Sequence, residues 1–216
     1  NEDVQDNSSP AFTVGPVPYV CVNTLFNYSN GAWDRDGDSM AFSIVMPQTS
    51  GMACPLIPRP LDFTSPAFNL VDNPFSTGNT FQISPLTGQL SFIPDIVQNA
   101  VITVLVREYR HGKLISAVMR DIQIVVMPCN QPPPGYTLDT AGITGGRSLE
   151  QGVYTCVGNT FKTCFSFKAP YSNAQLVIKD NSSITAPGAT INYTGIMTDS
   201  IRGCLEWSPG IGDTGW

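Results

Sequence analysis

Alternation of hydrophobic and polar residues is the clearest pattern in this chain, and it is strongest near the middle. The runs Val101–Tyr109 and Leu114–Met127 are rich in β-branched residues and alternate in polarity. The four residues Arg110–Lys113 separate them and carry His-Gly at their centre, which is typical of a hairpin turn. No window shows a sustained helical period. The pattern predicts two long antiparallel strands.

Shorter strand-like runs precede this hairpin. Pro16 and Pro18 interrupt the first of them, which places it at a sheet edge. The segment 47–80 is Pro-rich and irregular, so it is expected to be an insertion or a functional loop. The predicted strands before the hairpin are Ala11–Val14, Val17–Val22, Thr24–Tyr28, Met40–Met46, Phe81–Ile83 and Gln89–Ile93.

Part of the chain is repeated. The stretch Val20–Phe26 aligns with Thr155–Phe161, and Gly88–Pro94 aligns with Gly203–Pro209, in the same order. Two long strands follow the first copy, but only seven residues follow Pro209, so the second copy is expected to lack its last two strands here.

The repeat divides the chain into two predicted modules. The first spans residues 1–130 and includes the insertion at 47–80, and the second, incomplete module spans 150–216. Between them, residues 131–149 contain three consecutive prolines and several glycines, which predicts a stiff linker.

Composition supports a β fold and excludes some functions. Only 13% of the residues are charged, 42% are hydrophobic, and there are 19 Gly and 18 Pro, which favours short strands and turns over helices or disorder. The net charge is −6 and no Lys/Arg cluster occurs, so no nucleic-acid partner is expected. There is no apolar run for direct membrane insertion and no signal peptide; since the chain begins with Asn1, we expect a mature or internal fragment.

The cysteines indicate an oxidising compartment. Six cysteines occur without a Cys-x-x-Cys pair, and His111 is the only histidine, so a Cys/His zinc site is not expected. Disulfides outside the cytoplasm are the better interpretation.

An acidic loop is the main candidate site. Asp34, Asp36 and Asp38 fall within five residues between two strand-like runs, and oxygen ligands at alternate positions suit Ca²⁺. An EF-hand is excluded because its glycine would stand at the sixth position and a glutamate at the twelfth, whereas here Gly37 is fourth and Val45 is twelfth. The alternative is a solvated polar turn, since Asp and Gly are common in turns.

No catalytic motif accompanies this loop, so the chain is not expected to be an enzyme. It has no Gly-x-Ser-x-Gly, His-Glu-x-x-His or phosphate-loop sequence. Its carboxylates cluster in one turn, which fits a metal better than the separated acid and base of a glycosidase. Four aromatics could form a sugar-stacking platform, but packing at strand ends is the preferred interpretation: Trp33, Tyr109, Trp207 and Trp216.

Several of these motifs together resemble a known family. They are Pro16–Cys21, Ala32–Met40, Thr87–Pro94, Val106–Ser116 and the terminal Cys129. The pattern resembles the repeated cadherin-like or immunoglobulin-like modules of very large Bacteroidota cell-surface adhesins, of the gliding-motility type exported by the type IX secretion system. The resemblance covers residues 8–129 and, more weakly, 150–216.

The resemblance implies an all-β fold of tandem Greek-key β-sandwiches, with the acidic loop and the hairpin Arg110–Lys113 at the same pole. Glu108 would then join Asp34, Asp36 and Asp38 as a fourth ligand of a structural Ca²⁺. In the second module the equivalent stretch Lys168–Gln175 carries no carboxylate.

The function implied is that of an extracellular structural repeat, stiffened by calcium and disulfides, that supports adhesion or gliding. Its partners would be neighbouring modules of the same chain, and surface glycans or other cell-surface proteins. The alternative is a carbohydrate-binding or accessory sandwich of a secreted glycan-degrading enzyme.

The implied topology also suggests disulfide pairs. Cys21 and Cys129 would end parallel strands at one pole, and Cys164 and Cys204 would lie on neighbouring strands of one sheet. Cys54 remains as an alternative partner for Cys21.

Two further expectations rest on sequence matches. Cys156 aligns with Cys21, so its partner is expected beyond residue 216. Asp followed by Ser or Thr and an aliphatic residue resembles the Bacteroidota O-glycosylation signal, which makes Ser39, Thr140 and Ser200 candidate sugar sites.

Overall fold

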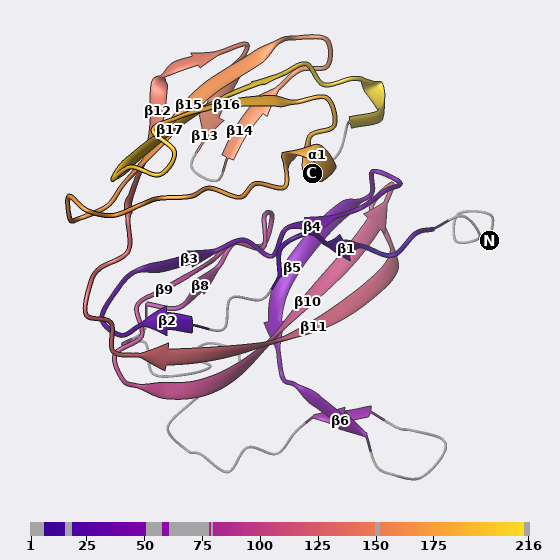
Figure 1. Ribbon diagram of the computed structural model, residues 1–216. Coiled ribbons are helices and arrows are strands. Elements are labelled where there is room, and N and C mark those ends of the chain that lie inside the picture. Colours follow the sequence, from indigo (N-terminus) through magenta and orange to yellow (C-terminus); the bar gives the residue numbers. More distant parts are fainter. Residues whose placement is uncertain are drawn as a thin grey trace. The chain divides into compact units, whose positions relative to one another are not determined.

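The computed structural model describes residues 7–15, 19–50, 58–60, 78, 80–149 and 152–213, and it confirms an all-β fold. The chain forms two compact units, Asn1–Cys129 and Asn130–Gly215, which we call unit 1 and unit 2 (Figure 1). No helix in the described segments is long and apolar enough to cross a membrane.

The larger sheet of unit 1 contains the predicted hairpin. Its strand order is β2 (Tyr19–Cys21), β11 (Lys113–Met127), β10 (Gln98–Arg110) and β5 (Ser39–Val45). Only β2 and β11 run parallel. The hairpin turn consists of His111 and Gly112, with φ of 51° and 77°. Positive φ at both central residues is what the type I′ hairpin turn requires.

A smaller sheet completes the core of unit 1. It consists of β3 (Phe26–Tyr28), β9 (Leu90–Phe92) and β8 (Gln82–Ile83). The alternating inward side chains of both sheets form one buried cluster: Val20, Tyr28, Met40, Phe42, Ile44, Leu90, Phe92, Ile102, Val104, Val106, Ile122, Ile124 and Val126. This is the arrangement that a half-buried strand with period-two patterning produces.

Two short ladders lie outside these sheets. Strands β1 (Ala11–Phe12) and β4 (Ala32–Trp33) pair near the acidic loop. Strands β6 (Gln48–Ser50) and β7 (Pro58–Pro60) pair within the predicted insertion. Cys54 lies outside the described residues, so its predicted alternative pairing with Cys21 is not addressed.

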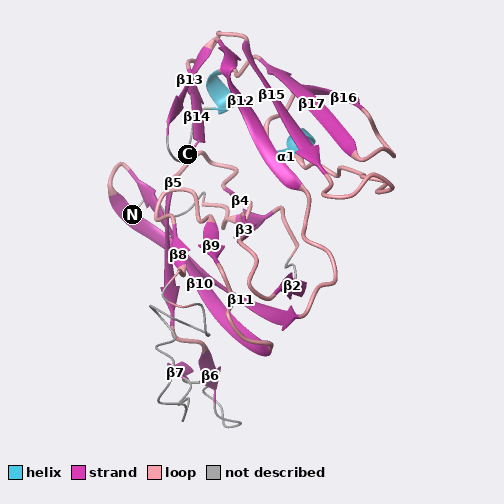
Figure 2. Ribbon diagram, turned by 90° about the vertical axis from the view of Figure 1, so that its left-hand side faces the viewer, coloured by secondary structure: helices cyan, strands magenta, loops and turns pink. Residues whose placement is uncertain are grey.

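Unit 2 is built on a four-stranded sheet (Figure 2). The order is β12 (Gly135–Thr144), β15 (Phe161–Lys168), β17 (Ser200–Trp207) and β16 (Thr190–Thr194), all antiparallel. Strands β13 (Gly146–Leu149) and β14 (Gly152–Thr155) form a hairpin, and two short helices, α1 (Ser182–Thr185) and η2 (Ile211–Asp213), complete the described elements.

The linker predicted over residues 131–149 is wrong in most of its length. Residues 135–144 form β12, which pairs with β15 from Gly135 opposite Lys168 to Asp139 opposite Cys164, and residues 146–149 form β13. Glycines and prolines there suggested a linker, but pairing with a neighbouring strand decides the local structure.

The two units share local structure at the aligned stretches. Phe26 stands opposite Phe92 in unit 1, and the aligned Phe161 stands opposite Trp207 in unit 2. The turn before β3 in unit 1 and the turn before β15 in unit 2 make the same long-range hydrogen bond. Asn23 N donates to Pro94 O at 2.7 Å, and Gly158 N donates to Pro209 O at 3.0 Å. Both donor residues have positive φ, 58° and 81°. These aligned stretches therefore adopt the same turn and the same strand register.

Candidate metal site

The acidic loop between β4 and β5 is ordered by one of its own carboxylates. Asp34 Oδ1 accepts the backbone N–H groups of Asp36 at 3.0 Å and Asp38 at 2.8 Å. Gly37 has φ of 76°, which lets the chain turn between them. All three carboxylates consequently lie close together, with one oxygen of each within 4.8 Å of the others.

Strand pairing brings Glu108 to this loop, as predicted from the family topology. In the ladder between β10 and β5, Glu108 stands opposite Met40 and Tyr109 opposite Ser39. The Ser39 hydroxyl donates to Tyr109 O at 3.0 Å. In the ladder between β10 and β11, Glu108 stands opposite Ser116 and Tyr109 opposite Leu114, so Ile115 is the extra residue of a bulge on β11.

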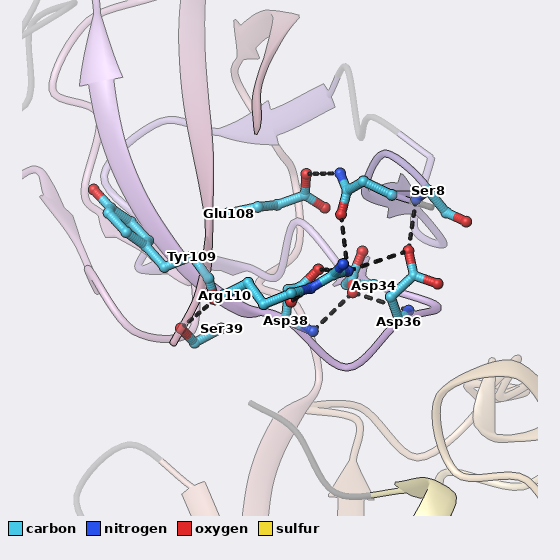
Figure 3. A network of polar contacts seen from close by, with 9 residues as sticks. Ser8, Asp34, Asp36, Asp38, Ser39, Glu108, Tyr109 and Arg110 are labelled. Atoms are coloured by element: carbon cyan, nitrogen blue, oxygen red, sulfur yellow. Dashed lines mark hydrogen bonds and ion pairs between the residues drawn. The ribbon is translucent and has the colours of Figure 1, made fainter. Parts of the chain in front are cut away.

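Two carboxylate oxygens at this site are buried without a hydrogen-bond donor among the described residues. They are Asp34 Oδ2 and Glu108 Oε1. Glu108 is 0% exposed and Asp34 is 7% exposed. Figure 3 shows the two side chains beside each other, with Arg110 below Glu108. A buried carboxylate without compensation is costly, so such oxygens indicate a site for a positive ligand.

The N-terminal segment also reaches the site. The Asn7 side-chain amide donates to Glu108 Oε2 at 3.2 Å, and Ser8 N donates to Asp36 Oδ2 at 2.5 Å. The site thus gathers three separate parts of the chain: the entering segment, the acidic loop and the end of β10.

Arg110 is a central residue of this site and was not predicted from the sequence. Its Nε donates to Asp38 Oδ1 at 2.8 Å and its Nη2 donates to Asp38 Oδ2 at 2.6 Å, a bidentate pair. Nη2 also lies 3.9 Å from Asp36 Oδ2 and donates to Asn7 Oδ1 at 3.2 Å. Position 110 is two residues beyond Glu108 on the same strand, and this spacing was the available signal.

The Arg110 guanidinium therefore already occupies one of the four predicted ligands, Asp38. Both oxygens of Asp38 accept hydrogen bonds from the guanidinium, so Asp38 balances Arg110 in this conformation. Asp34 and Glu108 each keep an oxygen without a donor in the described part of the chain, and these are the two groups best placed to hold a cation.

Electrostatics at the site favour a further cation. Burial raises the pKa of Glu108, and the adjacent Asp34 raises it further, while the nearby side chains of Ser116 and Asn7 act in the opposite direction. Hydrogen bonding to Asp38 raises the pKa of Arg110, which stays charged. Four carboxylates (Asp34, Asp36, Asp38 and Glu108) and one guanidinium give 1 − 4 = −3 when all are ionised. A divalent cation would offset most of this charge.

The donor set is entirely oxygen. Carboxylates together with the Asn7 amide suit a hard cation held in loose geometry, with water completing the shell. The cluster that the described residues form contains no Cys or His ligand. The residues present therefore fit Ca²⁺ better than zinc.

Both predicted disulfides are confirmed. Cys21 and Cys129 are bonded, with their Cα atoms 5.3 Å apart, at the ends of the parallel strands β2 and β11. Cys164 and Cys204 stand directly opposite each other on β15 and β17, with Cα atoms 4.1 Å apart. These bonds indicate a non-cytoplasmic protein.

The three candidate glycosylation sites differ in their exposure to solvent. Ser39 is half-buried with its hydroxyl engaged on Tyr109, which disfavours it as a sugar acceptor. Thr140 and Ser200 are exposed. Thr140 lies in the part of β12 where the register with β15 is interrupted.

The aromatic residues considered as a sugar platform belong to separate places. Trp33 and Tyr109 are half-buried in unit 1. Trp207 is half-buried in unit 2, and its Nε1 donates to Pro187 O at 3.0 Å. Trp216 lies outside the described residues.

No protein-family model matches this chain, and no curated protein matches its sequence.

Proposed function

We propose that this chain is a non-catalytic, calcium-stabilised part of an extracellular surface protein, with unit 1 holding Ca²⁺ at Asp34, Asp36 and Glu108 beside the Asp38–Arg110 pair. One observation carries the proposal: Asp34 and Glu108 each bury a carboxylate oxygen that no donor in the described part of the chain satisfies. A bound cation would satisfy both oxygens at once.

The bound ion would act as a clamp. It would connect the entering segment at Asn7 and Ser8, the acidic loop and the end of β10, which meet at this site. Removing the ion would leave several like charges facing each other, so Asn7 and Ser8, which precede the β1–β4 ladder, would be held less tightly to the loop. Calcium would in this way set the stiffness of the entry into unit 1.

An ion that holds these three segments together suits a load-bearing repeat of a surface adhesin. The Cys21–Cys129 disulfide closes a loop with a sequence separation of 108 residues around unit 1, and Cys164–Cys204 cross-links the sheet of unit 2. Cross-links and a cation both oppose extension of the chain. The family resemblance of residues 8–129 supports the same role, in adhesion or gliding motility at the cell surface.

Thermal unfolding with and without Ca²⁺ tests the proposal. If the site has the affinity of an extracellular calcium site, unit 1 should be more stable in 10 mM Ca²⁺ than in chelator by roughly 1–3 kcal/mol. This corresponds to a shift of several degrees in Tm. The Asp34→Asn and Glu108→Gln double variant should lose this shift, whereas Asp95→Asn, an exposed carboxylate of unit 1, should keep it.

A Tm that is the same in calcium and in chelator would overturn the metal site. The adhesin role is tested separately on glycan arrays. Saturable glycan binding that is lost in Trp33→Ala would instead favour the carbohydrate-binding alternative.

A further inference from the structure

The proposed cation site offers one oxygen atom from each of its carboxylates. Asp34 Oδ1 already accepts the backbone N–H groups of Asp36 and Asp38, and its buried Oδ2 has no donor in the described part of the chain. Asp36 Oδ2 accepts the backbone N–H of Ser8 at 2.5 Å, which leaves Oδ1 for an ion (Figure 3). In Asp34 and Asp36 the second oxygen is therefore occupied by backbone groups.

Glu108 differs, because a side chain occupies its second oxygen. The Asn7 amide donates from Nδ2 to Glu108 Oε2 at 3.2 Å, while Glu108 Oε1 is buried without a donor among the described residues. The other end of the same amide fixes its orientation, because Asn7 Oδ1 accepts Arg110 Nη2 at 3.2 Å. A guanidinium has only donors, so a rotated amide would place its NH₂ group against another donor. Asn7 therefore keeps one oxygen of Glu108 occupied.

The number of carboxylate oxygens decides which divalent ion such a site prefers. Calcium takes six to eight oxygen ligands and accepts a carboxylate through one oxygen or through both. Magnesium is smaller, requires near-octahedral geometry and keeps several of its waters, so carboxylates that each give one oxygen suit it. A second oxygen from the same carboxylate therefore strengthens calcium binding much more than magnesium binding.

We propose that Asn7 sets the ion selectivity of this site by restricting Glu108 to one oxygen, so that the site holds Mg²⁺ nearly as well as Ca²⁺. This inference rests on the proposed function, since it requires that Asp34, Asp36 and Glu108 hold a divalent cation. Asp36 is exposed, so water can complete the shell of a small cation on that side. Without the Asn7 donor, Glu108 offers both oxygens, and calcium gains a ligand that magnesium does not use.

A role of Asn7 in charge or packing alone would affect both ions. Loss of its hydrogen bond leaves the buried Glu108 carboxylate less compensated, which strengthens the binding of any cation. Because this effect is common to both ions, it cancels in the ratio of their dissociation constants. The ratio of the magnesium Kd to the calcium Kd therefore reports how many oxygens Glu108 supplies.

Ion titrations of the full chain and three variants test the proposal. The Kd values of Ca²⁺ and Mg²⁺ are obtained from the rise in Tm with ion concentration, for each ion separately, at pH 8 and constant ionic strength. Asn7→Ala removes the donor, and Asn7→Asp replaces the donor by an oxygen while keeping the acceptor for Arg110. Ser8→Ala is the matched control, because Ser8 contacts the site through its backbone N–H.

We expect a magnesium-to-calcium Kd ratio below about ten in the parent chain. The ratio should rise about ten-fold in both Asn7 variants, mainly because the calcium Kd falls, and it should stay unchanged in Ser8→Ala. Asn7→Asp also adds a negative charge, so both ions should bind it more tightly than they bind Asn7→Ala. Agreement between two variants of different charge and size would exclude packing as the cause.

Two results would overturn the proposal and leave the cation site intact. An unchanged or lower ratio in the Asn7 variants would show that Asn7 has only a structural role. A parent chain that binds calcium about a hundred-fold more tightly than magnesium would show that Glu108 already supplies both oxygens. A parent chain whose Tm responds to neither ion would overturn the proposed function itself, and this inference with it.

Discussion

Asp34 and Glu108 belong to distant parts of the chain, yet each directs into the same site one buried carboxylate oxygen that no donor among the described residues satisfies. Their proximity raises the pKa of Glu108, although burial is the larger cause. Nearby, the Arg110 guanidinium forms a bidentate pair with Asp38. The site therefore holds one cation of its own and has the charge and the free oxygens for a second.

The pH dependence of the proposed calcium binding follows from this pair. Because the folded-state pKa of Glu108 is raised, protonation of Glu108 favours the calcium-free fold: this contribution is complete below the ordinary glutamate pKa and disappears as pH rises through the raised value. Calcium needs the ionised form, so its effect has the opposite sign. The Tm increase from 10 mM Ca²⁺ should be small near pH 4 and reach its full size by pH 8, as measured by calorimetry.

Glu108→Gln separates the two effects. The variant should stabilise the calcium-free protein at pH 8 by about 1–2 kcal/mol, because a buried charge next to Asp34 is removed, and it should lose most of the calcium response. Asp95→Asn is the control. A calcium-free Glu108→Gln protein less stable than the parent at pH 8 would contradict the assignment of Glu108 as an uncompensated charge.

Arg110 should act as an internal competitor for the added cation. In Arg110→Ala the local charge with all groups ionised changes from −3 to −4, so calcium affinity measured by titration calorimetry should rise several-fold. Without calcium the same variant should lose about 1–3 kcal/mol, since the buried Asp38 carboxylate loses its bidentate partner. Arg107→Ala, which removes a bond to Ser43 Oγ on the same sheet, should leave calcium affinity unchanged. Weaker calcium binding in Arg110→Ala would show that the guanidinium organises the ligands instead.

Sequence patterns predicted the features that depend on strand order and register. The long hairpin follows from period-two alternation around His111 and Gly112, and the position of Glu108 beside the acidic loop follows from the topology that the family resemblance implied. The internal repeat aligns Phe26 with Phe161 and Phe92 with Trp207. In the structure Phe26 stands opposite Phe92, and Phe161 stands opposite Trp207. These features depend on alternation and spacing, which the sequence displays directly.

The sequence did not predict features that depend on side-chain rotamers or on pairing at the edge of a sheet. Whether Arg110 turns toward Asp38 or into solvent depends on its rotamer, which no spacing rule sets. The sequence predicts a linker where β12 forms, because Pro132–Gly135 and the glycines that follow are typical of linkers, and only the pairing with β15 reveals a strand. Trp216 and Cys54 are not described by the structure.

The two disulfides should stabilise the two units separately. In the chain-entropy model, the Cys21–Cys129 loop, with a separation of 108, contributes about 5 kcal/mol, and the Cys164–Cys204 loop, with a separation of 40, about 4 kcal/mol. Replacing both cysteines of one pair by serine should lower the unfolding transition of that unit and leave the other unit nearly unchanged. Calorimetry of both double variants checks this. A single transition that shifts equally in both would show that the units unfold together.

A pair of glycine substitutions should show how tightly the two sheets of unit 1 meet. Gly88 and Gly112 both have positive φ, 68° and 77°, so alanine strains the backbone at either position by about 1–2 kcal/mol. A Cβ at Gly88 would also lie 2.5 Å from the ring of Phe42, whereas one at Gly112 would meet nothing within 4 Å. Gly88→Ala should therefore cost about 1–3 kcal/mol more than Gly112→Ala in urea unfolding. Phe42→Leu should recover part of the difference in the Gly88→Ala background, because the smaller side chain makes room for the added methyl group. Equal costs for the two glycine variants would mean that the ring of Phe42 moves aside freely and that the core at this turn is loosely packed.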